Sequence, residues 1–384
     1  MDETELLEVI ARGEDSKHQF KANVTNPVAL ASEMVAFANA EGGQIFIGVN
    51  DDGTIGGLSQ DDMRRLNQLI ANVASQHVYP PVNPVTENRM IGDKLVLVVT
   101  LLAGISKPYM DNSGVIWVKS GSDKRKVTSR EEVQRMYQAA RLIHADETPA
   151  NGLSLSDVDF DYFSAFFERE YGEKIEDQGI DLRQLLENMN LMREGVLNLA
   201  GGLLFAQRPQ FRLPAFIVKA VCYSGTDIAE ERYLSSDDIS GKLAVVFQNA
   251  KGFVMNSLLR MQGERGINSL GAREVPDIVW EELIANALIH RDYFISAPVR
   301  IMIYSDRVEI ISPGHLPNNL TIENIKKGNS NIRNPILASF ATKILPYRGL
   351  GSGIRRALKV YPHIEFVDDR EGNLFIAIIK RKMA

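Results

Sequence analysis

The feature that most constrains this chain is the segment 281–293, in which polar residues recur with the period of an α-helix. Residues four apart on a helix are neighbours, so Glu282, Asn286 and His290 are expected on one face. The buried side of that helix would be formed by Leu283, Ala287, Leu288 and Tyr293. A carboxylate and an amide one turn apart can position a water and hold Mg²⁺, as phosphoanhydride hydrolysis requires. A merely solvated polar face is an equally open interpretation.

Two further segments favour a phosphate ligand. The apolar runs 299–304 and 307–311 flank Ser305-Asp306 and predict a β-hairpin, which ends at a turn-rich break over 312–317. Segment 348–356 then places glycines at every second position before a helical pattern. Such a loop suits backbone amides that approach phosphates at a helix N-terminus. Arg355 and Arg356, which follow it, are expected on a solvated helix face.

The order of these segments resembles the GHKL nucleotide-binding fold of histidine kinases and gyrase-type topoisomerases. More closely, "ELIANALIHRDY", "RVEIISPGHLP", "SNIRNPILASF" and "GLGSGI" resemble the ATP-binding half of bacterial RecG-like transcriptional regulators. The resemblance implies that Glu282 activates water and that Asn286 binds Mg²⁺. It implies that the phosphate lid is formed by Gly349, Gly351 and Gly353.

The same resemblance places further residues at the nucleotide. Ser312 and Gly314 fall where many members of the wider fold carry the Asp-x-Gly that recognises adenine, and the missing Asp is a departure from that pattern. Arg333 is expected to face the γ-phosphate or a partner subunit, while the next residue, Asn334, caps a helix that starts at Pro335. The last nucleotide-facing candidates are His290, Arg291 and Asp292, for which a local ion cluster is the alternative. A Gly-x-x-x-x-Gly-Lys-Ser/Thr phosphate loop is absent from the sequence, so a helicase is not expected.

The N-terminal half carries a second resemblance. A helical run over 27–40, a Gly-Gly turn, a buried strand and an Asp-Asp-Gly turn follow one another. Together with the preceding segment 13–21, "MVAFANAEGGQIFIGVNDDG" resembles the AlbA-like domain of the Schlafen family, over roughly residues 8 to 140. The resemblance implies nucleic-acid binding. Some Schlafen members cut RNA with three carboxylates, and the matching positions here are Glu14, Gln19 and Asp51.

Gln19 weakens the nuclease interpretation, because an amide lacks the charge that helps to hold a divalent metal. Turn chemistry is the favoured explanation of Asp51. A metal-dependent nuclease that uses Glu14 and Asp51 therefore remains only an alternative. Clustered cations in this half can neutralise phosphates, and Tyr109 can offer a stacking face. The candidate nucleic-acid contacts are Lys21, Lys107, Tyr109, Lys119, Lys124, Arg125, Lys126 and Arg130, followed by Arg135 and Arg141. A solvated charged surface is the alternative.

Whole-chain properties limit these interpretations. The formal net charge is −6, which excludes a generally basic nucleic-acid binder. Apolar runs stay shorter than the roughly 20 residues of a membrane span, and the acidic N-terminus is unlike a signal peptide. A single cysteine, Cys222, permits no intrachain disulfide and fits a reducing cytoplasm. Cys222 is expected to be a packing residue in a buried strand.

We therefore expect an α/β (α+β) protein with a Schlafen AlbA-like domain over 1–145, a helical connector over 146–200 and a GHKL-like α/β sandwich over 201–384. Two short helices of the connector, 157–171 and 182–190, could form a helix-turn-helix. The expected function is that of a transcriptional regulator in which ATP and Mg²⁺ control nucleic-acid binding, with DNA favoured over RNA. A cytoplasmic homodimer without membrane contact is expected. An interaction protein with a degenerate nucleotide pocket is the second alternative.

Overall fold

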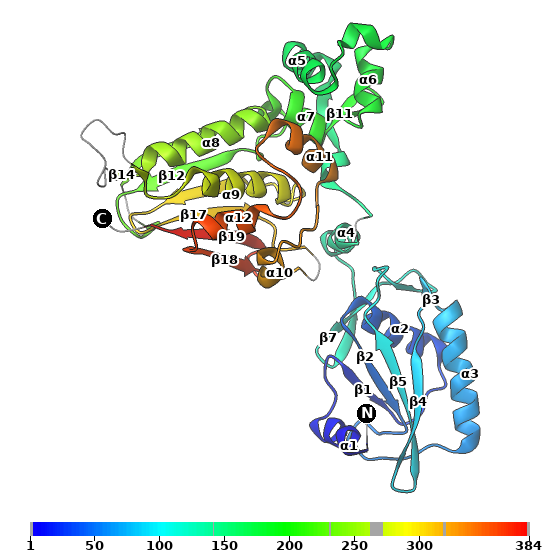
Figure 1. Cartoon of the computed structure of the whole chain (residues 1–384). Coiled ribbons are helices and arrows are strands. Elements are labelled where there is room, and N and C mark those ends of the chain that lie inside the picture. Colours follow the sequence, from blue (N-terminus) through cyan, green and yellow to red (C-terminus); the bar gives the residue numbers. More distant parts are fainter. Residues whose placement is uncertain (1–2, 141, 230–231, 262–271, 318–319, 382–384) are drawn as a thin grey trace. The chain divides into compact units, whose positions relative to one another are not determined.

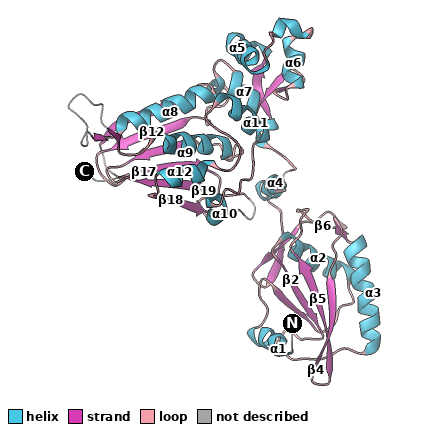
Figure 2. Ribbon diagram, in the orientation of Figure 1, coloured by secondary structure: helices cyan, strands magenta, loops and turns pink. Residues whose placement is uncertain are grey.

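The computed structural model describes residues 3–140, 142–229, 232–261, 272–317 and 320–381. The chain forms two compact units, Met1–Leu142 and Ile143–Ala384, which are described separately (Figure 1). Both units combine helices with sheets, so the predicted mixed α/β class is confirmed (Figure 2).

The first unit is built on a four-stranded sheet in which the first two strands are parallel and the other pairs antiparallel. In spatial order its strands are β1 (His18–Lys21), β2 (Gly42–Ile47), β5 (Lys94–Leu102) and β4 (Val85–Ile91). Side chains alternate between the two faces of a strand. The odd-numbered Ile45 and Ile47 therefore join one apolar cluster, while Phe46 joins a second cluster.

Helices cover both faces of this sheet. Helices α2 (Pro27–Asn39) and α3 (Gln60–Gln76) contribute to the cluster that contains Ile45 and Ile47, and α1 (Glu3–Arg12) contributes to the cluster of Phe46. The remaining elements of the unit are short: β3 (Val78–Tyr79), β6 (Met110–Asp111), β7 (Trp117–Ser120), β8 (Asp123–Lys126) and α4 (Arg130–Ala139). The β7–β8 hairpin packs on α2 and carries much of the basic segment.

The second unit begins with the helical connector. Its elements are η1 (Ala145–Glu147), β9 (Pro149–Ser154), η2 (Leu155–Asp157), α5 (Phe160–Tyr171), η3 (Ile175–Gln178), α6 (Leu182–Asn188), β10 (Met192–Arg193), β11 (Val196–Asn198) and α7 (Leu199–Phe205). Strand β11 lies between β10 and β9 in a small antiparallel sheet. The buried aromatic residues Phe163, Phe166 and Phe205 contact Phe340 or one another, within the same core as the rest of the unit. These aromatic residues of the connector therefore serve packing.

A six-stranded sheet forms the body of the second unit (Figure 1). In spatial order its strands are β13 (Tyr233–Ile239), β12 (Val218–Tyr223), β16 (Val299–Ile303), β17 (Arg307–Pro313), β19 (Leu374–Lys380) and β18 (Ile364–Asp369). Helices α8 (Leu243–Ser257), α9 (Asp277–His290) and α12 (Gly353–Val360) lie along one face of it (Figures 1 and 2). The other elements are η4 (Pro209–Phe211), β14 (Arg260–Met261), β15 (Ala272–Arg273), α10 (Ile322–Lys326) and α11 (Pro335–Ile344).

The predicted hairpin and the predicted burial of Cys222 are both present in the second unit. The hairpin is confirmed as β16 paired with β17, although β17 continues through Pro313, two residues into the predicted break. Cys222 is buried in β12, and burial raises the pKa of its thiol, as expected of a packing residue. The predicted cap on α11 is wrong in detail. Asn334 occupies the N-cap position, but its side-chain amide donates to the carbonyl oxygens of Ile289 and Arg291 instead. In the described part of the chain, no helix is both long and apolar enough to cross a membrane.

The N-terminus of α11 is satisfied by a distant carboxylate. Asp146, in η1, is fully buried, and its Oδ2 accepts a hydrogen bond of 2.9 Å from the Leu337 backbone N–H. Its Oδ1 has no partner among the described residues. Burial raises the pKa of Asp146 to about 6, although the backbone hydrogen bonds oppose that shift.

We predict that Asp146→Asn removes a pH-dependent loss of stability. Because the folded pKa lies above the unfolded value of about 3.9, Asp146 destabilises the fold progressively as pH rises from about 4 to 6, by up to about 3 kcal/mol. The stability of the variant relative to the wild type should therefore increase over this interval and then level off. Urea denaturation at several pH values measures it, with the exposed Asp161→Asn as control. A difference that does not change with pH would contradict the assignment.

Candidate functional site

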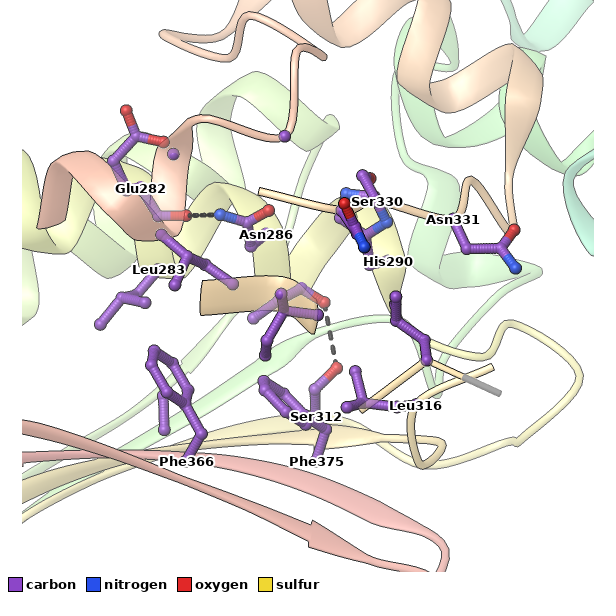
Figure 3. Close-up of a pocket in the computed structure, with 18 of the residues that line it drawn as sticks. Glu282, Leu283, Asn286, His290, Ser312, Leu316, Ser330, Asn331, Phe366 and Phe375 are labelled. Carbon is purple, nitrogen blue, oxygen red and sulfur yellow. Dashed lines mark hydrogen bonds between the residues drawn. The ribbon is translucent and has the colours of Figure 1, made fainter. Parts of the chain in front are cut away.

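Helix α9 brings the three predicted polar residues to one cavity. Glu282, Asn286 and His290 all line it, as the helical period requires (Figure 3). About 1020 Å³ of space, part of it open to solvent, lies between its walls. Its walls come from α9, the end of β17 and the segments on either side of α11, with β18 and β19 below.

The two ends of the cavity differ in chemistry. One end is apolar and is lined by Leu283, Ile310, Leu316, Phe366, Phe375 and Ala377 (Figure 3). The other is polar and is lined by Glu282, Asn286, Ser330, Asn331, Arg348, Gly349, Gly351, Gly353 and Arg356. A ligand with a flat apolar part and an anionic part matches this division.

Glu282 is buried and has a charged partner. Its side chain is only 4% exposed, and its Oε1 forms an ion pair with Nη2 of Arg356 in α12. Burial raises the pKa of Glu282, whereas the positive charge of Arg356 lowers it. The expectation of a solvated face is therefore wrong for Arg356, while its neighbour Arg355 is exposed.

Asn286 and His290 have fixed orientations. The Asn286 Nδ2 donates to the Glu282 carbonyl oxygen at 2.6 Å, which turns its Oδ1 the other way (Figure 3). The His290 Nε2 lies 2.9 Å from the Tyr347 hydroxyl oxygen. Burial, and the nearby positive charge of Arg333, lower the pKa of His290 to about 4, so this ring is neutral at physiological pH.

The glycine loop needs its glycines for different reasons. Gly349 and Gly351 have positive φ angles of 68° and 67°, which favour glycine. A Cβ on Gly351 would also lie 2.0 Å from the Gly328 carbonyl oxygen. A Cβ on Gly353 would lie 2.1 Å from Glu282 Oε2, so the bare Cα allows α12 to begin against that carboxylate.

Three expected nucleotide contacts do not line the cavity. Arg291 Nη2 donates to the carbonyl oxygens of Ile295 and Ala297, and the guanidinium packs against the rings of Phe216 and Tyr293. Its Nε has no partner among the described residues. This buried guanidinium therefore finds most of the partners it needs within the protein.

The side chains of Asp292 and Arg333 also form hydrogen bonds within the protein. The Asp292 carboxylate accepts a hydrogen bond from the Phe294 N–H. Arg333 donates to the His315 carbonyl oxygen at 2.9 Å. Gly314 lies against both, since a Cβ there would come within 2.6 Å of each side chain. Gly314 and Ser312 themselves line the cavity, where the Ser312 hydroxyl donates to the Ala287 carbonyl oxygen at 3.2 Å.

In the first unit, the predicted acids are not assembled as a metal site. Glu14 accepts 2.6 Å hydrogen bonds from the Gln19 side chain and the Phe20 N–H, and Gln19 in turn accepts one from Lys119. Asp51 lies exposed in the turn after β2. Among the described residues, no group of three or more His, Cys, Asp or Glu side chains is arranged to hold a metal ion.

Most of the predicted cations are bonded within the fold. The Lys107 amine donates to the Ala40 carbonyl oxygen, and burial lowers its pKa, as it does for Lys119. Lys124 pairs with the buried Glu33, and Lys21 Nζ lies 3.9 Å from a Glu14 oxygen. These four amines are therefore poor candidates for free phosphate contacts.

The remaining candidates lie on β8 and α4. Lys126 and Arg130 are exposed, whereas the exposed Arg125 forms a two-pronged pair with Glu132. Tyr109 is only 5% exposed, so its expected role as a stacking face is wrong in this structure. Arg135 is exposed on α4, and Arg141 lies outside the described residues.

Comparisons with known proteins find a separate match in each of the two units. Residues 14–128 match the family model described as "Schlafen, AlbA_2", and residues 296–370 match "Putative ATP-dependent DNA helicase recG C-terminal". The chain thus carries an N-terminal match to a Schlafen AlbA_2 domain and a C-terminal match to a RecG C-terminal domain. No curated protein matches the chain.

Two solved structures are similar at low identity. The DIP2311 protein from Corynebacterium diphtheriae is 20% identical, with a TM-score of 0.46 over 98% of this chain and 80% of that one. The N-terminal domain of a "Putative ATP-dependent DNA Helicase RecG-related Protein" from Nitrosomonas europaea is 20% identical. Its TM-score is 0.23, over 34% of this chain and 96% of that one. Both TM-scores fall below 0.5, so neither likeness supports a functional assignment.

The RecG C-terminal match leaves out part of the cavity. Glu282, Asn286 and His290 precede residue 296, so their assignment rests on the cavity geometry and not on that match. The sequence reasoning missed Arg348 and Arg356 as lining residues. The spacing of Gly353 and Arg356, one helical turn apart, is the signal that places Arg356 on the cavity side.

We predict different losses of stability for two alanine substitutions in the glycine loop, residues 349–353, of the second unit. Gly349→Ala meets no atom closer than 3.5 Å and should cost about 1 kcal/mol, from its positive φ alone. Gly351→Ala should lower the free energy of unfolding by about 1–3 kcal/mol more, because the Gly328 backbone must move. Urea denaturation of both variants measures the difference. Equal losses would contradict the close approach of the two backbone segments.

Proposed function

We propose that the RecG C-terminal domain binds ATP with Mg²⁺ and that this controls nucleic-acid binding by the Schlafen AlbA_2 domain. The observation that carries the proposal is the cavity beside α9, which combines an apolar end with a polar end built from a glycine loop. A purine fits the first end, and a polyphosphate fits the second.

The polar end has the groups that phosphates need. The glycine loop leads into the N-terminus of α12, where free backbone amides favour anions. Arg348 and Arg356 add positive charge to the same end. Because the loop lacks β-carbons at its three glycines, phosphate oxygens can approach its backbone closely.

The residues also fit a magnesium ion bound through the nucleotide. Mg²⁺ usually takes one or two protein oxygens and completes its shell with water and phosphate. Asn286 Oδ1 is the oxygen we assign to it, and the cation would neutralise phosphate charge. Glu282 is the candidate base for a weak ATPase activity.

The end of the cavity that would hold the nucleobase supports adenine less strongly than the polar end supports phosphate. Ser312 replaces the expected Asp and already donates its hydroxyl proton to Ala287, so it offers the base only an acceptor lone pair. An interaction protein with a degenerate nucleotide pocket is therefore the alternative that binding experiments must separate.

Asn286→Ala should abolish binding of ATP–Mg²⁺. Removing the amide deletes the proposed metal oxygen, so the wild type should release measurable heat with ATP–Mg²⁺ in calorimetry and the variant should not. Asn188→Ala, which truncates an exposed amide on α6, is the matched control and should bind like the wild type. If the wild type itself binds no nucleotide, the degenerate pocket is the correct interpretation.

For the Schlafen AlbA_2 domain we propose nucleic-acid binding through the exposed cations of β8 and α4. We favour DNA over RNA and a role in transcriptional regulation by a cytoplasmic homodimer; the family match of residues 14–128 supports the coarser part of this proposal, nucleic-acid binding. The nuclease alternative has no support from the geometry, because Glu14 is bonded to Gln19 and Asp51 lies in an exposed turn.

The double variant Lys126→Ala/Arg130→Ala should weaken binding of duplex DNA and lower its salt dependence. Each lost phosphate contact reduces the slope of log K against log salt by about 1. Fluorescence anisotropy at several salt concentrations measures both quantities. The control, Arg64→Ala on α3, removes an exposed arginine from another helix of the same domain. An unchanged affinity and an unchanged slope would show that nucleic acid contacts another surface of the domain.

A further inference from the structure

The ion pair between Glu282 and Arg356 carries one further inference, which rests on the proposed nucleotide site. The pair joins α9, which holds the candidate base, to α12, which follows the glycine loop directly. Both side chains line the cavity. The pair therefore lies at the polar end of the cavity, the end assigned above to the polyphosphate.

Both members of the ion pair are largely removed from solvent. The Glu282 side chain is 4% exposed and that of Arg356 is 29% exposed. Gly353 lies against the second carboxylate oxygen, Oε2, because a Cβ there would come within 2.1 Å of it. Arg356 Nε is buried and has no partner among the described residues. The ion pair with Glu282 therefore does not use every donor of the guanidinium.

Phosphate is a suitable acceptor for that guanidinium. Arginine presents several donors in a planar fork, which matches two phosphate oxygens at once. A buried ion pair is costly to break when one charge is left alone, but an exchange of partners avoids that penalty. A phosphate that binds at the loop therefore offers Arg356 a substitute for Glu282.

We propose that Arg356 is a nucleotide-dependent switch: without nucleotide it holds Glu282, and the terminal phosphate of a nucleoside triphosphate takes it over. Glu282 is then free to accept a hydrogen bond from a water in the cavity. Arg356 is a positioning residue for Glu282, and it binds the phosphate directly. A diphosphate, which lacks the terminal group, leaves the ion pair in place.

The switch makes opposite predictions for its two members. A ligand shifts such an equilibrium only through its different affinity for the two states. Glu282→Gln removes the competing charge, so Arg356 is released beforehand and triphosphate should bind several-fold more tightly. Arg356→Ala removes the phosphate contact, so triphosphate should bind at least tenfold more weakly while the affinity for ADP changes less than twofold.

The test is calorimetry with a non-hydrolysable ATP analogue and with ADP, both with Mg²⁺, on the full chain. Arg355→Ala is the matched control, because it removes the exposed arginine next to Arg356. The variant Glu282→Gln/Arg356→Ala guards against loss of folding, since it leaves no buried carboxylate without a partner. It should bind the analogue as weakly as Arg356→Ala does.

The outcomes separate the switch from the proposed function. Equal weakening of both ligands by Arg356→Ala would show a merely structural role, and weaker triphosphate binding by Glu282→Gln would also overturn the switch. In either case nucleotide binding by the wild type would leave the proposed function intact. If the wild type binds neither ligand, the proposed function fails and the switch fails with it.

Discussion

The second unit depends on the burial of α9, which packs on the sheet with α8 and α12 as its neighbours. Nearly every apolar residue of this helix is in the core, and even Glu282 is almost inaccessible. A buried polar group must find a partner, so the placement of α9 determines what surrounds it. Asn334 donates to the backbone at the C-terminal end of α9, and Arg356 pairs with Glu282. Both contacts are consequences of that single constraint.

The same constraint explains why cations near the cavity have different roles. Arg291 is buried and Arg333 is half-buried, and neither lines the cavity. Arg291 donates to the carbonyl oxygen of Ile295, whereas Arg333 donates to that of His315, next to Gly314. Arg348 and Arg356 line the cavity itself. Charge alone therefore does not identify a ligand contact, because the tertiary structure decides whether a guanidinium donates to backbone carbonyls or faces the cavity.

The first unit shows a comparable division. Its basic residues look like one patch in the sequence, yet Lys107, Lys119 and Lys124 are bonded to groups on other elements of the unit. These bonds join the β7–β8 hairpin and its neighbours to β1 and α2. Only the outer members of the segment, including Lys126 and Arg130, remain exposed. A run of cations can thus stabilise a fold and still leave a smaller charged surface.

The sequence by itself determined the mixed α/β class, the hairpin of β16 and β17 and the shared face of Glu282, Asn286 and His290. These features follow from local periodicity, which acts over a few residues. Only the tertiary structure decided that Arg356 pairs with Glu282, that Asp146 caps α11 across 191 positions and that Tyr109 is buried. Such contacts join segments far apart in the chain, and no local pattern specifies which of several polar groups will meet in the core.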